Sequence, residues 1–172
     1  MESPSPPPDA IESAAIETND GVFTAYFSER GLRRLDFPPR FHPGKHRASP
    51  NKPSSRYSPW IATLKSALNE ALQAKAPSRL PPLDLQAGTA FQQSVWRALQ
   101  RIPPKKTMTY GEVAQAIGRP KATRAVGQAC GANPIPVLIP CHRVVAAHGA
   151  IGGFSCGLEL KRMLLEREGI RF

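Results

Sequence analysis

The chain has 172 residues, of which 41% are hydrophobic and 21% charged, a composition typical of a globular protein with one domain or two small ones. No stretch approaches the roughly 18 apolar residues of a membrane span, and the acidic, Pro-rich start lacks the apolar run of a signal peptide. The net charge is +10: residues 88–172 hold 12 basic and 4 acidic side chains, against 11 and 9 in residues 1–87. Such a concentrated positive field suits a polyanion, nucleic acid first, although solubility or an anionic membrane surface would also explain it.

The first half is Pro-rich and irregular. Residues 1–14 are predicted to form a disordered tail, because they bury too little apolar surface to order themselves. A scaffold domain over residues 15–87 follows, with a hairpin whose strands cover 22–27 and 32–37 around a turn at 28–31. Residues 38–59 are predicted to be a long exposed loop, and the apolar spacing over 60–72 predicts a helix. We place the domain boundary near Gly88.

The second half, residues 88–172, is denser in helix. Thr89 is expected to cap a helix with Phe91, Val95, Trp96 and Leu99 on one face. Two short helices follow, one over 111–118 and one from Lys121 towards Gly131, joined by a tight turn. In a basic region this pattern is typical of a helix-turn-helix, although a plain αα-hairpin has the same pattern.

The second of these helices has small residues where a DNA reader usually has polar ones. They are Ala122, Ala125, Gly127, Ala129 and Gly131. Arg124 is the one long basic side chain among them. Small residues permit close approach to a minor groove or a sugar-phosphate backbone, and they equally permit tight helix packing.

The most informative stretch is residues 133–145. Its apolar run, Ile135–Ile139, is predicted to be a buried extended segment that delivers Cys141 and His142 at its end. Basic neighbours would favour the Cys141 thiolate, which is the nucleophilic form. Neighbouring side chains of an extended chain point to opposite sides, so either the backbone turns at this pair or a water molecule relays the proton. The orienting acid stays open among Glu112, Glu159, Glu166 and Glu168.

Three cysteines, an odd number, do not make a disulfide framework, and they lack the spacing of a metal site. We therefore expect no metal and no cofactor, and a reducing cytosol as the setting. Cys130 and Cys156 are interpreted as structural. Four glycines in residues 149–157 predict a loop with close backbone approach, in which Phe154 and Ser155 form the wall of a planar pocket, and a last helix packs against that loop.

Pro140-Cys141-His142-Arg143 followed by Val144-Val145 closely resembles the signature of the methylated-DNA–protein-cysteine methyltransferases, the O6-alkylguanine-DNA alkyltransferases. The agreement covers residues 82–169 in order, and Leu35–Pro38 match more loosely. Its other motifs are Gly88-Thr89, Phe91-Gln92, Val95-Trp96, Ile102-Pro103, Thr109–Glu112, Arg124–Gly127, Asn133-Pro134, Gly152-Gly153 and Lys161–Glu168. The resemblance implies an α+β fold: a small antiparallel β-sheet and helix domain of ribonuclease-H-like type, then a mainly helical, winged-helix-like domain with the helix-turn-helix.

The resemblance also implies a reaction. Cys141 would accept the alkyl group from guanine O6 and become a permanent thioether, with His142 as its base through water and Glu168 orienting that histidine. Asn133 would brace the site, and Tyr110 would assist rotation of the nucleotide and donate to the guanine. Chemistry on an atom hidden in a duplex requires base extrusion.

The partner implied is double-stranded DNA that contains O6-alkylguanine, bound by a monomer in the cytoplasm at the nucleoid. Arg124 would fill the place of the flipped guanine, its helix would lie in the minor groove, and Val144 and Ser155 would contact the base through their backbones. Helix positions expected at the DNA are Ala122, Ala125, Gly127 and Gly131.

The chain departs from the family pattern at three places. Phe154 stands where Tyr is usual, so we expect activity with an altered adduct preference. Lys105-Lys106 replaces the usual Gly-containing turn, so that loop is expected to differ. Residues 1–129 contain no cysteine, so the zinc site of some members should be absent.

Three other functions compete with repair. An alkyltransferase-like protein binds alkylated DNA without repairing it, but such proteins replace the acceptor cysteine that Cys141 matches. A helix-turn-helix regulator would need readout side chains that the small-residue helix lacks. A Cys-His hydrolase would need an oxyanion hole, for which the sequence offers no obvious candidate.

Overall fold

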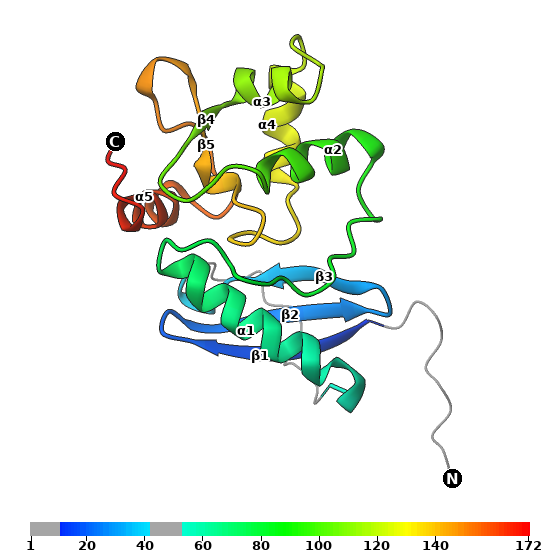
Figure 1. The fold of residues 1–172 in the computed structure, drawn as a ribbon. Coiled ribbons are helices and arrows are strands. Elements are labelled where there is room, and N and C mark those ends of the chain that lie inside the picture. The colour runs from blue at the N-terminus through cyan, green and yellow to red at the C-terminus, as the bar shows by residue number, and fades with distance from the viewer. Residues whose placement is uncertain (1–10, 42–52) are drawn as a thin grey trace.

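The computed structural model describes residues 11–41 and 53–172, and it has a mixed α+β fold (Figure 1). Its N-terminal half holds an antiparallel sheet in the order β1-β2-β3, with β1 at Glu12–Thr18, β2 at Gly21–Ser28 and β3 at Gly31–Asp36. Helix α1 (Ser58–Leu72) follows. Short 3-10 turns at Pro39–Phe41 (η1) and Ser55–Tyr57 (η2) lie between β3 and α1.

The C-terminal half is mainly helical. Its helices are α2 (Ala90–Leu99), α3 (Tyr110–Ala116), α4 (Thr123–Gly131) and α5 (Leu158–Arg167). A two-stranded parallel pair joins β4 (Met108–Thr109) to β5 (Val144–Val145). Two 3-10 turns, η3 (Cys141–Arg143) and η4 (Ala147–Gly149), flank β5. In the described part of the chain, no helix is long and apolar enough to cross a bilayer.

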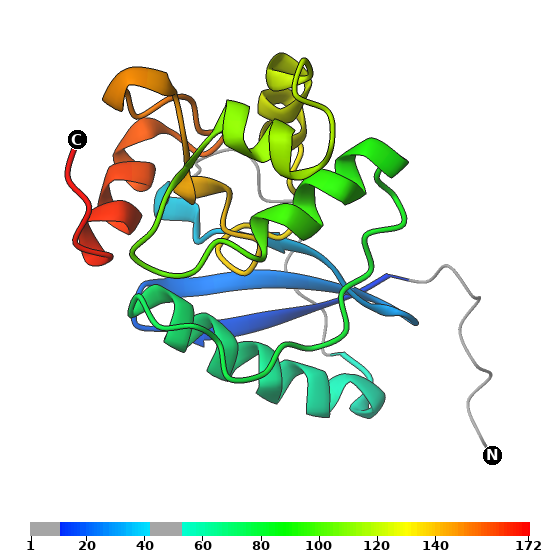
Figure 2. The same ribbon diagram turned by 45° about the horizontal axis from the view of Figure 1, so that its top comes forward.

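The sheet lies between α1 and the C-terminal half (Figure 2). The predicted hairpin is confirmed as β2 and β3, and the predicted helix as α1. Strand β1 was not predicted: it begins at Glu12, inside the proposed 1–14 tail, because it pairs with β2 along its whole length. Residues 1–10 lie outside the described part.

The predicted exposed loop over 38–59 is wrong at its end. Tyr57 is buried and its ring stacks on Phe27, with the ring centroids 5.4 Å apart. Helix α1 then begins at Ser58, with Pro59 in its first turn. Residues 42–52 of that loop lie outside the described part.

Capping residues explain where α2 and α3 begin. The Thr89 side chain accepts a hydrogen bond from the Gln92 backbone amide, and the Gln92 side-chain oxygen accepts one from the Thr89 backbone amide. Thr109 and Glu112 form the same reciprocal arrangement at α3. The second cap makes Tyr110 the first residue of α3, and α3 and α4 are the two short helices predicted from the sequence.

The two halves share one apolar core, which runs from the sheet and α1 through α2 and α4 to α5. A backbone hydrogen bond also joins them, from the Leu35 amide of β3 to the Pro134 carbonyl at 2.9 Å. The boundary proposed near Gly88 falls in the connection before α2 and stays a prediction.

The predicted extended segment Ile135–Ile139 is wrong. The residues are buried as expected, but they form a turn in which the Ile139 amide donates to the Ile135 carbonyl at 2.9 Å. Val137 has φ +74°, a left-handed conformation. Prolines at 134, 136 and 140 lack the amide hydrogens that a sheet ladder requires, so the stretch folds back on itself. It leads directly into η3, which carries Cys141 and His142.

Candidate active site

Cys141 lies at the wall of a pocket of about 150 Å³ between α3, α4 and the loop after η4. The other lining residues are Tyr110, Gly127, Cys130, Gly131, Gly153, Phe154 and Ser155. Residues predicted from the loop and from the helix-turn-helix therefore meet at one site. Cys130, interpreted from sequence as purely structural, lines the same pocket.

Asn133 holds the Cys141 side chain. Its Nδ2 donates to Cys141 Sγ at 3.1 Å and to the Ile139 carbonyl at 2.7 Å, while its Oδ1 accepts from the Ile135 amide at 3.0 Å. These three bonds fix which way the amide points. The role predicted for Asn133, bracing the cysteine, fits this geometry.

His142 and Glu168 form a buried pair, each about 3% exposed. His142 Nε2 lies 3.0 Å from Glu168 Oε1. Burial lowers the pKa of His142, against the opposing influence of Glu168, so the ring is neutral at pH 7. An ionised carboxylate only accepts, so Nε2 carries the hydrogen and Nδ1 keeps a lone pair. Nδ1 is buried and has no hydrogen-bond partner among the described residues.

Glu168 is ionised because of what surrounds it. Burial by itself would raise its pKa, but bonds from His142, Arg143 and the Lys105 amide outweigh burial and lower it to about 2. Arg143 donates from Nε to Glu168 Oε1 at 3.0 Å and from Nη1 to the Ile102 carbonyl at 2.7 Å. Of the four acids left open by sequence, the structure brings Glu168 to His142, whereas Glu112 caps α3.

The prediction that basic neighbours favour the Cys141 thiolate is wrong. Burial raises the pKa of Cys141 to about 11, against the weaker lowering influences of the Asn133 bond and the Lys161 charge. Arg143 forms an ion pair with Glu168, and His142 is neutral. Neither of these sequence neighbours therefore supplies the positive charge that was expected to favour the Cys141 thiolate.

Lys161 was missed as a site residue, although it belongs to the matched motif. Its side chain is fully buried, and Nζ donates to the Val144 carbonyl at 2.6 Å and to the Gly153 carbonyl at 2.9 Å. Burial lowers its pKa to about 8. Only the three-dimensional fold reveals this role, since a lysine on a helix is ordinarily exposed.

The backbone of Val144 makes hydrogen bonds next to the pocket. It is absent from the pocket lining, its amide donates to the Cys141 carbonyl, and its carbonyl accepts from Lys161. A carbonyl oxygen can accept a second hydrogen bond, so the predicted backbone contact between Val144 and a base stays a prediction.

The Tyr110 hydroxyl ties α3 to the glycine-rich loop. It accepts from the Gly153 amide at 3.2 Å and lies 3.4 Å from the Gly153 carbonyl. Burial raises the pKa of Tyr110, so its hydroxyl is a proton donor. At Gly152, with φ +73°, a Cβ would lie 3.0 Å from that hydroxyl, so this close approach requires glycine.

The helix predicted to face DNA is α4, and some of its small residues line the pocket whereas others do not. Gly127 and Gly131 line the pocket. Arg124 is exposed and Ala122 is the residue before α4, while Ala125 is half-buried; none of the three lines the pocket. Arg124 makes no ion pair among the described residues, so its charge faces outward.

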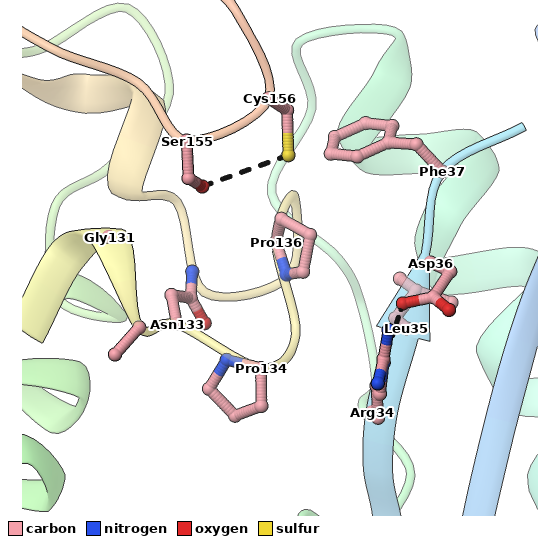
Figure 3. Close-up of a pocket in the computed structure, with 11 residues that line it drawn as sticks. Arg34, Leu35, Asp36, Phe37, Gly131, Asn133, Pro134, Pro136, Ser155 and Cys156 are labelled. Atoms are coloured by element: carbon pink, nitrogen blue, oxygen red, sulfur yellow. Dashed lines mark hydrogen bonds and ion pairs between the residues drawn. The ribbon is translucent and has the colours of Figure 1, made fainter. Parts of the chain in front are cut away.

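A second pocket of about 310 Å³ adjoins the first through Gly131 and Ser155. Figure 3 shows the Arg34–Asp36 ion pair of β3 on one side of it and Ser155 with Cys156 on the other. Cys156, like Cys130, thus lines a cavity. Residues of β3 therefore border the second pocket, which adjoins the pocket of Cys141.

No group of histidines, cysteines and acids in residues 11–41 and 53–172 is placed to hold a metal ion. The zinc site discussed for the N-terminal half has no cysteine to form it. The groups available for chemistry at Cys141 are its buried thiol, the neutral imidazole of the next residue and the hydroxyl of Tyr110.

Comparison with known proteins gives matches over most of the chain. A family model described as the 6-O-methylguanine DNA methyltransferase DNA-binding domain matches residues 90–170. A methylated-DNA–protein-cysteine methyltransferase of Methanosarcina barkeri is 40% identical over 158 residues, which is 89% of this chain and 94% of that protein. One of Methanosarcina acetivorans is 55% identical over 82 residues, a stretch that spans 53% of its length.

Solved structures agree with the sequence matches. The crystal structure of Mycobacterium tuberculosis OGT in complex with DNA superposes with a TM-score of 0.74 at 35% identity, covering 92% of this chain and 93% of that one. The O6-methylguanine-DNA methyltransferase from Pyrococcus kodakaraensis gives a TM-score of 0.61 at 29% identity and covers 94% of this chain and all of that one. The resemblance therefore extends to the N-terminal half, where sequence motifs were loose.

Proposed function

The chain belongs to the family of methylated-DNA–protein-cysteine methyltransferases, which are enzymes, and we propose that it repairs O6-alkylguanine in double-stranded DNA by moving the alkyl group onto Cys141. The observation that carries this proposal is the buried thiol of Cys141 in a pocket, followed in the chain by His142, whose tautomer is fixed by Glu168.

The state of the thiol determines how the reaction must run. With a pKa of about 11, roughly one Cys141 side chain in ten thousand is a thiolate at neutral pH. A preformed thiolate is too rare, so the proton has to leave as the sulfur attacks. His142 Nδ1, buried and unpartnered, is the available acceptor, directly or through one water molecule.

The step then balances as a single displacement. Cys141 Sγ forms a bond to the alkyl carbon while the bond from that carbon to guanine O6 breaks. The thiol proton passes to His142 Nδ1, and Glu168 stabilises the resulting imidazolium through Nε2. The electron pair stays on the guanine, where the protonated Tyr110 hydroxyl offers a hydrogen bond to the developing negative charge. The thioether product is stable, so each molecule acts once.

Reaching O6 requires the guanine to leave the stack, and the pocket admits it between Tyr110 and the loop that carries Phe154 and Ser155. We propose that α4 lies in the minor groove and that Arg124, exposed and free of ion pairs among the described residues, fills the gap. Gly131 supports this placement, because a Cβ added there would meet nothing within 4 Å.

The remaining parts of the proposal follow from the substrate. The protein acts as a monomer in the cytoplasm, at the DNA, and needs no cofactor for the displacement. The ribonuclease-H-like and winged-helix-like comparisons of its two halves stay predictions. The non-repairing alkyltransferase-like alternative is not favoured, because Cys141 occupies the position that those relatives replace.

A repair assay tests the proposal. Duplex DNA with one O6-methylguanine is incubated with protein, digested to nucleosides and analysed for the remaining adduct. The loss of O6-methylguanine should equal the amount of protein and should vanish in Cys141→Ser. Cys130→Ser, which changes the other thiol of the same pocket, is the matched control and should retain repair. Loss of adduct beyond one equivalent, or repair by Cys141→Ser, would overturn the proposal.

A further inference from the structure

An ion-pair cluster joins the N-terminal sheet to the end of α5. Asp20, in the turn between β1 and β2, is about 8% exposed. Its Oδ2 accepts from Arg167 Nη1 and its Oδ1 accepts from Arg167 Nη2 at 2.8 Å, a two-pronged pair. Arg40 approaches the same carboxylate at 3.4 Å. The hydrogen bond with Arg167 lowers the pKa of Asp20, so the carboxylate is ionised at neutral pH.

The turn itself is held in shape. The Thr18 hydroxyl donates to the Gly21 carbonyl at 2.8 Å and accepts from the Asp20 amide at 3.2 Å. Gly21 has φ +108°, which glycine adopts readily. The carboxylate of Asp20 is thus presented from a fixed loop. In Figures 1 and 2, α5 lies beside the end of the sheet where this loop turns.

Arg167 is the last residue of α5, and the next residue, Glu168, caps that helix. Arg167 Nη1 also donates to the Leu72 carbonyl at the end of α1, at 3.4 Å. Two elements of the N-terminal half therefore hold the end of α5 in place. At the adjoining residue, Glu168 bonds His142, Arg143 and the Lys105 amide.

We infer that Asp20 is a positioning residue for the reaction: by fixing Arg167, it sets the place of Glu168 and hence the orientation of His142. This inference rests on the proposed function for its rate measurement. It assigns to the N-terminal half a task beyond packing, because the Asp20–Arg167 ion pair is connected to the His142 imidazole through one residue, Glu168. A buried imidazole needs an oriented partner to act as a base. If Glu168 is held less firmly, the imidazole of His142 is less well oriented to take the proton of the Cys141 thiol.

The test compares Asp20→Asn with Glu12→Gln. Glu12 accepts from Arg56 and from Ser54 within the N-terminal half, so its variant also loses an ion pair of the sheet without touching α5. The rate constant for methyl transfer is measured well below the unfolding midpoints of all variants, together with affinity for undamaged duplex. Asp20→Asn should lower the rate about tenfold at unchanged affinity, and Glu12→Gln should leave it within about twofold. Asp20→Glu, which keeps the carboxylate, should recover most of the rate.

A second readout does not need transfer at all. The titration of the His142 imidazole is followed by NMR and assigned with His142→Asn. In Asp20→Asn the His142 pKa should fall further below the ordinary histidine value, because the raising influence of Glu168 weakens, and in Glu12→Gln it should stay in place. An unchanged titration and an unchanged rate in Asp20→Asn overturn the inference, and so does a rate loss that Glu12→Gln shares. Absence of transfer in the unaltered protein refutes the proposed function instead, and the titration still decides the role of Asp20.

Discussion

Replacing Glu168 by Gln should reveal how much the buried carboxylate stabilises the fold. The fold lowers the pKa of Glu168 from 4.5 to about 2, and each tenfold change in an acid constant corresponds to about 1.4 kcal/mol. The ionised carboxylate therefore contributes about 3 kcal/mol at neutral pH. Because the side chain is about 3% exposed, solvent screening takes little from this value.

The sign of the effect fixes its pH range. A carboxylate with a lowered pKa stabilises the fold above the unfolded pKa, and this stabilisation disappears as pH falls through the folded value. The free energy of unfolding of Glu168→Gln at pH 7 should thus be about 3 kcal/mol lower than that of the unaltered protein. The gap between the variant and the unaltered protein should close between about pH 4.5 and pH 2.

Urea unfolding at a series of pH values measures this gap. Glu159→Gln is the control, since Glu159 is exposed in the first turn of the same helix. Its unfolding free energy should follow that of the unaltered protein at every pH. A gap for Glu168→Gln that is absent at pH 7, or that persists undiminished to pH 2, would refute the reasoning. Methyl transfer should also fall sharply in Glu168→Gln, because the imidazole loses the negative charge that stabilises its protonated form.

Three further predictions follow from single side chains. Arg124→Ala should slow transfer from duplex DNA much more than transfer from free O6-benzylguanine. Lys65→Ala, which removes an exposed charge on α1, should change neither rate. Equal losses on both substrates in Arg124→Ala would show that Arg124 has no part in base flipping. Lys105 has φ +66°, so Lys105→Gly should raise the unfolding free energy by about 1 kcal/mol in urea, and Lys106→Gly, which lacks a positive φ, should not. Because burial lowers the pKa of His142, the transfer rate should hold as pH falls through 6.5 and decline only below it; a decline centred at 6.5 in a pH–rate profile would contradict a buried neutral base.

The sequence predicted what local chemistry dictates. The Thr89 cap, the two short helices and the β2–β3 hairpin each follow from residues close together in the chain, and all are present. The basic neighbours of Cys141 led to its prediction as a nucleophile, and that role stays a prediction because these neighbours do not supply the expected positive field. The family resemblance, and not the spacing, distinguished Glu168 from the other acids. That choice depends on a contact across 26 residues, which no local pattern encodes.

What sequence missed depends on burial and on distant partners. Strand β1 is held by its pairing with β2, a contact between distant residues that the composition of the chain does not predict. The Cys141 environment was misjudged because Arg143 turns to Glu168, a direction that neighbours in sequence do not reveal. Asp20 and Arg167 are separated by 147 residues, so their pairing is visible only in the fold.

The most direct test of the central claim is where the alkyl group ends. The protein is incubated with excess duplex containing O6-methylguanine, its intact mass is measured, and the modified peptide is mapped. We expect one methyl group per chain, on Cys141, with Cys130 and Cys156 unmodified although Cys130 lines the same pocket and Cys156 lines the adjoining one. A methyl group on Cys130 or Cys156, a second methyl group, or loss of the adduct with no change in protein mass would contradict it.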